Sequence, residues 1–115
     1  MNIQVFGTKK CFDTKKVERF FKERRIKYQF IDLKEKGMSM GELNSVKASV
    51  SINELINEKS KSFKTSNITN VRSADVKIEM LFNDQTLIIT PVVRNGKKAV
   101  GWFKPEVFEE WINND

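Results

Sequence analysis

Cys11 is the only cysteine in this chain of 115 residues, and the chain contains no histidine. A cysteine thiolate is a strong nucleophile, so a single cysteine supports nucleophilic attack or thiol–disulfide exchange. The lack of histidine removes the Cys–His nucleophile pair and the commonest general base. A zinc site made from one cysteine and no histidine is not expected either.

The surroundings of Cys11 favour a reactive thiol. A short predicted strand, Ile3–Phe6, precedes it, and an amphipathic helix is predicted to follow it. Free N–H groups and partial positive charge at a helix N-terminus stabilise a thiolate. Thr14 is placed to donate its hydroxyl to the sulfur, and four lysines add positive charge nearby: Lys9, Lys10, Lys15 and Lys16. The alternative is a small buried apolar residue, which a polar loop rich in lysine disfavours.

Pro91 is the second residue of note, because it interrupts a run typical of a strand, Ile88–Val93. Proline is normally excluded from strand interiors. It either begins an edge strand or forms a cis peptide bond beside the thiol loop. The run itself leaves both alternatives open.

The first third of the chain predicts a βαβ unit. Apolar residues at helical spacing follow Cys11, with Asp13 or Thr14 as the expected helix cap. Tyr28–Leu33 then has the bulky side chains that strands favour.

The middle of the chain predicts short helices around Leu43 and Leu55, and a third that begins at Ser73 and ends near Asn83. The polar stretch Lys59–Asn70 is expected to be an exposed connection. No internal repeat or linker is apparent, so one domain over residues 1–115 is predicted.

The last third changes period. Leu87–Ile89 and Pro91–Arg94 are predicted to be extended around the proline. Asn95-Gly96 is typical of a hairpin turn, after which Lys97–Val100 returns as a strand. Pro105 favours the start of a final helix. The predicted order is βαβ, helices, ββα.

The net charge of +6 suits an anionic partner: an anionic substrate, glutathione, an acidic protein surface or nucleic acid. The lysine-rich segments Lys9–Lys16, Lys59–Lys64 and Lys97–Lys104 would form an anion pocket if the fold gathered them around Cys11. No helix–turn–helix or zinc module is apparent, so sequence-specific DNA binding is not expected. A cytoplasmic protein without a membrane partner is predicted, because no basic leader or long apolar run is present.

Several segments together resemble the arsenate-reductase-like family, which includes glutaredoxin-coupled arsenate reductases and Spx-type transcriptional regulators. The resemblance spans nearly the whole chain and is carried by Gly7–Lys16, Tyr28–Leu33, Glu58–Phe63, Ile89–Val93 and Gly101–Glu106. It implies an α/β, thioredoxin-like (glutaredoxin-like) mixed sheet with a helical insertion over about residues 38–83. It also implies that Cys11 is the nucleophile and that Pro91 is cis and faces it.

The resemblance further implies an oxyanion site. Arsenate reductases of this type hold the oxyanion with three basic residues, and the matching positions here are Lys59 (or Asn57), Thr90 and Lys104. Threonine cannot replace the bidentate grip of arginine, and lysine does so only in part. This departure argues against arsenate as the substrate.

Two functions follow from the resemblance. The first is a monothiol oxidoreductase with no bound cofactor, in which Cys11 attacks an anionic or oxidised small molecule. An external thiol, glutathione or glutaredoxin, would resolve the adduct. The thiolate would be stabilised by Thr14 and Lys15, and the anion or thiol would be held by Lys9, Lys10, Lys59, Thr90, Pro91 and Lys104.

The second function is an Spx-like regulator that binds the C-terminal domain of the RNA polymerase α subunit. Many such regulators carry a Cys-x-x-Cys switch, but Thr14 occupies the fourth position here, so no internal disulfide can form. A family member with an inert Cys11 is a third alternative.

Overall fold

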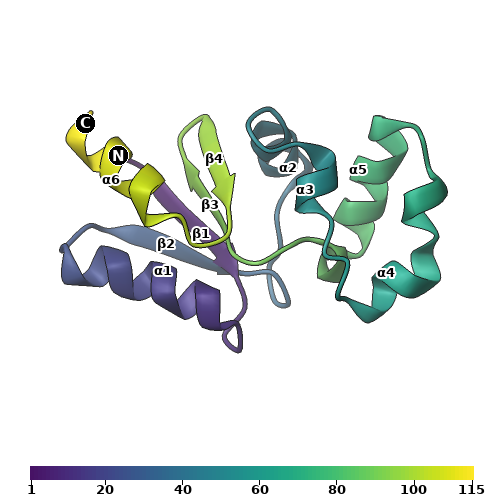
Figure 1. Ribbon diagram of the computed structural model, residues 1–115, viewed down its shortest axis with the longest axis horizontal. Coiled ribbons are helices and arrows are strands. Elements are labelled where there is room, and N and C mark those ends of the chain that lie inside the picture. Colours follow the sequence, from purple (N-terminus) through teal and green to yellow (C-terminus); the bar gives the residue numbers. More distant parts are fainter.

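Four short strands form one mixed sheet in the computed structural model, which describes residues 1–115 (Figure 1). The order across the sheet is β2-β1-β3-β4, and the strands are β1 (Ile3–Gly7), β2 (Tyr28–Asp32), β3 (Val92–Asn95) and β4 (Lys98–Gly101). β1 is parallel to β2 and antiparallel to β3, and β3 and β4 form the hairpin predicted at Asn95-Gly96. The positive φ of Gly96, +61°, suits such a turn.

Six α-helices and two 3-10 helices complete the fold, and none is long and apolar enough to cross a membrane. The helices are α1 (Phe12–Glu23), α2 (Met40–Lys47), α3 (Ile52–Leu55), α4 (Lys61–Ser66), η1 (Ile68–Asn70), α5 (Ala74–Asn83), η2 (Gln85–Leu87) and α6 (Pro105–Asn113). The parallel βαβ unit, the inserted helices and the C-terminal ββα unit make this a thioredoxin-like fold with a helical insertion, as predicted.

The alternation of side chains along β1 divides the core into two. Ile3 and Val5 point to the face that α1 and α6 cover, where they belong to a cluster with the aromatic side chains of both helices. Phe6 points to the opposite face, because successive side chains of a strand alternate. Figure 1 shows the resulting layout, with α1 and α6 at one end of the long axis and α3–α5 at the other.

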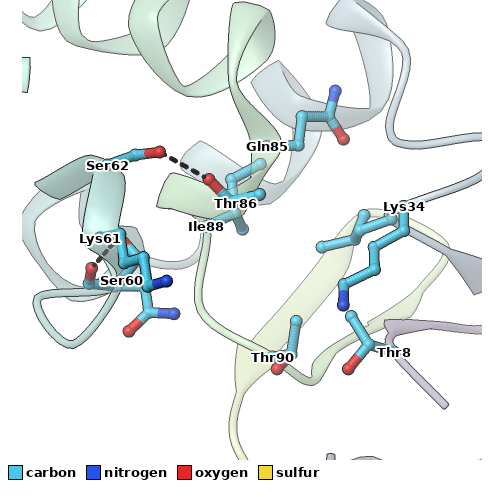
Figure 2. Close-up of a pocket in the computed structure, with 11 residues that line it drawn as sticks. Thr8, Lys34, Ser60, Lys61, Ser62, Gln85, Thr86, Ile88 and Thr90 are labelled. Atoms are coloured by element: carbon cyan, nitrogen blue, oxygen red, sulfur yellow. Dashed lines mark hydrogen bonds between the residues drawn. The ribbon is translucent and has the colours of Figure 1, made fainter. Parts of the chain in front are cut away.

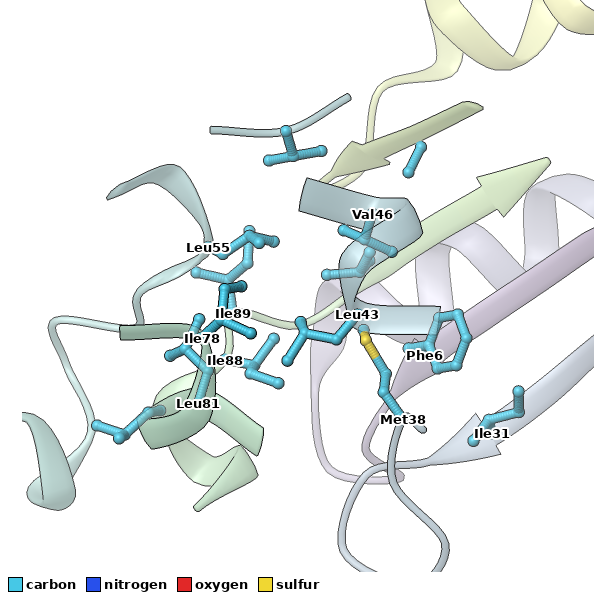
Figure 3. Close-up of a cluster of buried hydrophobic side chains, with 14 of the residues drawn as sticks. Phe6, Ile31, Met38, Leu43, Val46, Leu55, Ile78, Leu81, Ile88 and Ile89 are labelled. Atoms are coloured by element: carbon cyan, nitrogen blue, oxygen red, sulfur yellow. The ribbon is translucent and has the colours of Figure 1, made fainter. Parts of the chain in front are cut away.

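The second cluster joins the sheet to the inserted helices (Figure 3). Phe6 and Met38 pack with Leu43 of α2, and the cluster continues through Leu55 and Leu81. Backbone hydrogen bonds close the far end: Asn57 N–H donates to Leu87 at 2.7 Å, and Ile89 N–H donates to Leu55 at 2.9 Å. These bonds fasten the insertion to the segment that leads into β3.

The stretch Lys59–Asn70 is largely exposed, as predicted, but it is not an irregular connection. This stretch contains α4 and η1, and Ile68 is fully buried. The Ser60 hydroxyl accepts the Phe63 N–H at 3.1 Å and thereby caps α4. Only Phe63 and Ile68 pack against the core, and the small number of apolar residues hides the helix in the sequence.

Two further expectations need correction. Of the predicted extended run Leu87–Ile89, Leu87 ends the 3-10 helix η2, and Ile88 makes only an isolated bridge to Ile56. The N-cap of α1 is Cys11 and not Asp13 or Thr14. The helix therefore starts earlier than expected. Thr14 lies within its first turn, on the face of α1 that is buried.

Candidate functional site

Cys11 occupies the junction between the carboxyl end of β1 and the first turn of α1. Its backbone is extended, with φ −81° and ψ 120°, and its N–H donates to Thr8 at 3.2 Å. Its side chain is half-buried and makes no capping hydrogen bond, so the first N–H groups of α1 keep no side-chain acceptor. A negative charge on the sulfur would find those N–H groups free.

Thr14, three residues after Cys11 in the first turn of α1, is completely buried. Its hydroxyl is the one buried side-chain polar group without a hydrogen-bond partner. A neutral thiol is a weak acceptor, whereas a thiolate is a strong one. Ionised Cys11 would therefore give this hydroxyl the partner that it lacks in the thiol form.

The pKa of Cys11 reflects the balance of these contacts. Burial raises the pKa of the thiol, but hydrogen bonds that the thiolate form would accept lower it, from the hydroxyls of Thr14 and Thr90 and from the N–H groups of Thr14 and Asp13. The net result is a pKa below the ordinary value. Hydrogen bonds outweigh desolvation here, and no lysine contributes to the shift.

Gly7 allows Thr14 to lie this close to the sheet. A Cβ at Gly7 would lie 2.6 Å from the Thr14 Cγ2 atom, closer than side chains tolerate. The end of β1 therefore needs a glycine for steric room rather than for a special backbone angle.

The peptide bond between Thr90 and Pro91 is cis, and this segment lies next to the thiol loop. The Cys11 thiol lies 3.5 Å from the Thr90 carbonyl oxygen, to which it donates. The Pro91 carbonyl in turn accepts the Trp102 N–H at 2.8 Å. The segment before β3 is thus held between the thiol loop and the residues that follow β4.

A cavity of about 480 Å³ opens beside this loop (Figure 2). Thr8, Lys34 and Thr90 line it on the thiol side. They belong to the loops after β1, after β2 and before β3, which lie at the same end of the sheet. Ser60 and Lys61 line it on the side of the insertion. Thr90 links the cavity to Cys11, since it belongs to the wall and also contacts the sulfur.

The wall of the insertion is held by a small hydrogen-bonded cluster. The Thr86 hydroxyl lies 2.5 Å from Asp84 Oδ1 and 3.0 Å from the Ser62 hydroxyl. Hydrogen bonds from Ser62 and Thr86 lower the pKa of the Asp84 carboxyl below its usual range. This cluster joins α4 to η2 and so fixes both to one wall of the cavity.

The predicted anion-binding residues are only partly brought together. Thr90 lines the cavity, as does Asn57, the alternative to Lys59, whereas Lys59 and Lys104 do not. The exposed Lys9 pairs with Glu35 at 3.6 Å. The Lys15 ammonium lies 5.7 Å from the centroid of the Phe12 ring, and the anion-binding and thiolate-stabilising roles of Lys10, Lys15, Lys59 and Lys104 stay predictions.

Lys97 and Lys98 lie at the opposite end of the sheet from Cys11. Asn95 pairs with Ile3 at the start of β1, and Cys11 follows its end. Four strand steps separate the two ends, a distance of about 13 Å. The fold therefore does not gather all three lysine-rich segments around the thiol.

Sequence reasoning missed Lys34 as a cavity residue, and it included Lys61 only as part of the segment Lys59–Lys64 without singling it out. A signal for Lys34 exists: it lies two residues after β2, and the carboxyl ends of the parallel strands β1 and β2 must lie at one end of the sheet. No signal distinguishes Lys61 from its neighbouring lysines, because its helix was hidden in a polar stretch.

Comparisons with known proteins agree with this architecture. A sequence model of the ArsC family matches residues 6–111. No curated protein matches the sequence. Among solved structures, the chain is similar to a Staphylococcus aureus protein at 27% identity and TM-score 0.80, covering 94% of this chain and 96% of that one.

Two further structures share the fold. An arsenate reductase from Vibrio cholerae is 20% identical with TM-score 0.84, covering 96% of this chain and 97% of that one. An arsenate reductase (ArsC) related protein from Brucella melitensis is 24% identical with TM-score 0.68, covering 97% and 95%. At these identities the likeness concerns the fold alone.

Proposed function

The chain belongs to the ArsC family, and we propose that it is a monothiol oxidoreductase whose nucleophile is the Cys11 thiolate. The observation that carries the proposal is the buried Thr14 hydroxyl, which has no hydrogen-bond partner while Cys11 is a thiol. A structural cysteine gains nothing from such a neighbour, whereas a thiolate gains a hydrogen bond. The lowered pKa of Cys11 supports the same assignment.

The reaction is written for a disulfide substrate. The Cys11 thiolate attacks one sulfur, the S–S bond breaks, and the second sulfur leaves with the electron pair and takes a proton from water. The product is a mixed disulfide at Cys11. A second thiol, glutathione or the thiol of a glutaredoxin, loses its proton to water, attacks the mixed disulfide at the substrate-derived sulfur, and releases Cys11 as a thiolate. At this point one half of the substrate is a free thiol and the other half is in a new disulfide with the external thiol, so one external thiol has been consumed. A second molecule of external thiol cleaves that disulfide and completes the two-electron reduction of the substrate.

Arsenate itself is expected to be a poor substrate. Thr90 stands where family members use an arginine, and no arginine lines the cavity. A hydroxyl donates one hydrogen bond without a positive charge, so a tetrahedral oxyanion loses the bidentate contact that arginine provides.

The proposal is tested by the pH dependence of alkylation. Purified, reduced protein is treated with iodoacetamide over a range of pH, and the apparent pKa of Cys11 is read from the rates. We expect a pKa below that of a free cysteine, about 8.5. Thr14→Val is the matched variant, which keeps the volume and removes the hydroxyl, and its pKa is expected to return toward the ordinary value. An ordinary pKa in the wild type would contradict the proposal.

A turnover assay separates the oxidoreductase from the regulator. The enzyme loses glutathione-dependent reduction of a mixed disulfide in Cys11→Ser. An Spx-like regulator would instead bind the polymerase α-subunit domain, and that binding would survive the same substitution. Polymerase binding by Cys11→Ser, together with no turnover by the wild type, would favour the regulator.

A further inference from the structure

The size of the cavity beside Cys11 does not suit a bare oxyanion. Its volume of about 480 Å³ equals roughly sixteen water molecules at about 30 Å³ each. A tetrahedral oxyanion has five heavy atoms and would leave most of that space to solvent. The volume lies within the range of about 300–1,000 Å³ that small-molecule sites occupy. The cavity therefore fits an extended ligand.

The chemistry of the lining selects an anionic, polar ligand. No carboxylate lines the cavity, and only Leu33 and Ile88 are apolar. The other neutral side chains carry hydroxyls or amides, which suit a ligand with several hydrogen-bonding groups. A hydrophobic ligand would leave these groups unpaired, at a cost in affinity.

Two lysines supply the charge, and they stand on opposite sides. Lys34 extends toward Thr8 and Thr90 at the thiol end (Figure 2). Lys61 is the first residue of α4 and follows the N-cap Ser60 on the other side of the cavity. Neither Lys34 nor Lys61 forms a salt bridge with a carboxylate, so both ammonium groups are available to a bound anion. Separated and unpaired, they match two anionic groups at a distance from each other.

The thiol end of the cavity brings such a ligand to the nucleophile. Thr8 and Thr90 line the cavity, and their carbonyl oxygens accept hydrogen bonds from the backbone N–H and the thiol of Cys11. Cys11 does not itself line the cavity, and it adjoins this end through its hydrogen bonds to Thr8 and Thr90. This is the end at which a bound thiol would approach the nucleophile.

We propose that this cavity binds a low-molecular-weight thiol, or its disulfide, that carries two separated carboxylates, one at Lys34 and one at Lys61. The assignment rests on the proposed function, because it supplies the thiol that exchanges with Cys11. It makes Lys34 and Lys61 the residues that select an extended thiol over a single oxyanion.

The test uses S-methylglutathione, which has two carboxylates and a thioether that cannot exchange with Cys11. Its dissociation constant for the reduced full-length protein is measured by calorimetry. We expect Lys34→Gln and Lys61→Gln each to weaken binding about tenfold, and the double variant to weaken it further. Lys36→Gln and Lys64→Gln are matched controls, since both lysines are exposed, lie close in sequence to the tested ones and do not line the cavity. Each control is expected to change binding by less than about twofold.

Three outcomes would overturn the assignment: no binding of the probe, equal effects in tested and control variants, or displacement of the probe by phosphate at similar concentration. The last result would show that one tetrahedral oxyanion satisfies both lysines. Alkylation of Cys11 is measured on the same samples. An activated Cys11 without lysine-dependent binding contradicts this inference alone, whereas lysine-dependent binding with an ordinary Cys11 pKa contradicts the oxidoreductase and leaves an anion site.

Discussion

Aromatic rings fill the core under α1 and α6, whereas aliphatic side chains fill the core of the inserted helices. In the first, Phe20, Phe21 and Phe108 pack with centroids 5.1–5.3 Å apart. In the second, Phe6 is the one aromatic residue among 15 buried ones. The aromatic core contains residues of β1 and α1, the two elements that flank the thiol loop. The aliphatic core contains residues of the inserted segment that forms the other wall of the cavity.

The helices of the two regions also begin differently. Each of α2, α3, α4 and α5 starts at a serine whose hydroxyl accepts a backbone N–H: Ser39, Ser51, Ser60 and Ser73. Neither α1 nor α6 has a side-chain cap. Such caps stabilise the short inserted helices, and α6 instead begins with Pro105. Uncapped α1 leaves its first N–H groups without a side-chain acceptor. On the proposed function, the first region would activate the thiol and the second would shape the cavity for its ligand.

The largest expected effect comes from deleting core side chains in each region. Phe21→Ala should lower the free energy of unfolding by about 3–5 kcal/mol, and Leu81→Ala by about 2–5 kcal/mol, since both side chains are fully buried. Urea titration measures both. Folded Leu81→Ala should keep a lowered Cys11 pKa and bind S-methylglutathione more weakly. Loss of thiol activation in Leu81→Ala would break the proposed division between regions.

Gly7→Ala should damage the thiol region alone. The new methyl group collides with the Thr14 side chain, and relief of such overpacking costs about 1–3 kcal/mol. The displaced hydroxyl no longer supports the thiolate, so the pKa of Cys11 should rise. Gly41→Ala in α2 is the control, since its Cβ would meet no atom closer than 3.9 Å. It should raise stability by up to about 1 kcal/mol, because alanine favours helices more than glycine does.

Ser60→Ala should weaken the cavity wall without affecting the thiol. Removal of the cap of α4 is expected to cost about 1 kcal/mol. Binding of S-methylglutathione should weaken, while the rate of Cys11 alkylation at each pH stays that of the wild type. Thr65→Ala, an exposed position in the same helix, serves as the control. Equal effects of the two substitutions on binding would argue against a role for the cap.

The smallest expected effect is a pH dependence of stability that belongs to Cys11. Its pKa is lower in the folded than in the unfolded chain, so the folded state favours the thiolate. The stabilisation is full above the unfolded pKa, about 8.5, and is lost as the pH falls through the folded pKa. Reduced wild type should therefore gain stability over Cys11→Ser as the pH rises from below the folded pKa to above the unfolded pKa of about 8.5. A constant difference between them would show that the thiolate is not stabilised.

The sequence determined the elements whose signals are local. The βαβ start, the hairpin at Asn95-Gly96 and the helix that begins at Ser73 follow from periodicity and from turn and cap chemistry. The place of Cys11 between β1 and α1 follows from the same patterns. Such signals suffice because the interactions behind them join residues a few positions apart.

Only the tertiary structure decided which distant groups meet. Thr14 could be singled out as a neighbour of the thiol, but that its hydroxyl is buried without a partner depends on packing against Gly7. Lys34 and Lys61 are 27 positions apart, and only the docking of α4 against η2 sets them on opposite sides of one cavity. Charge patterns along a chain do not encode such pairings, because the core that folds the insertion back onto the sheet is made by other residues.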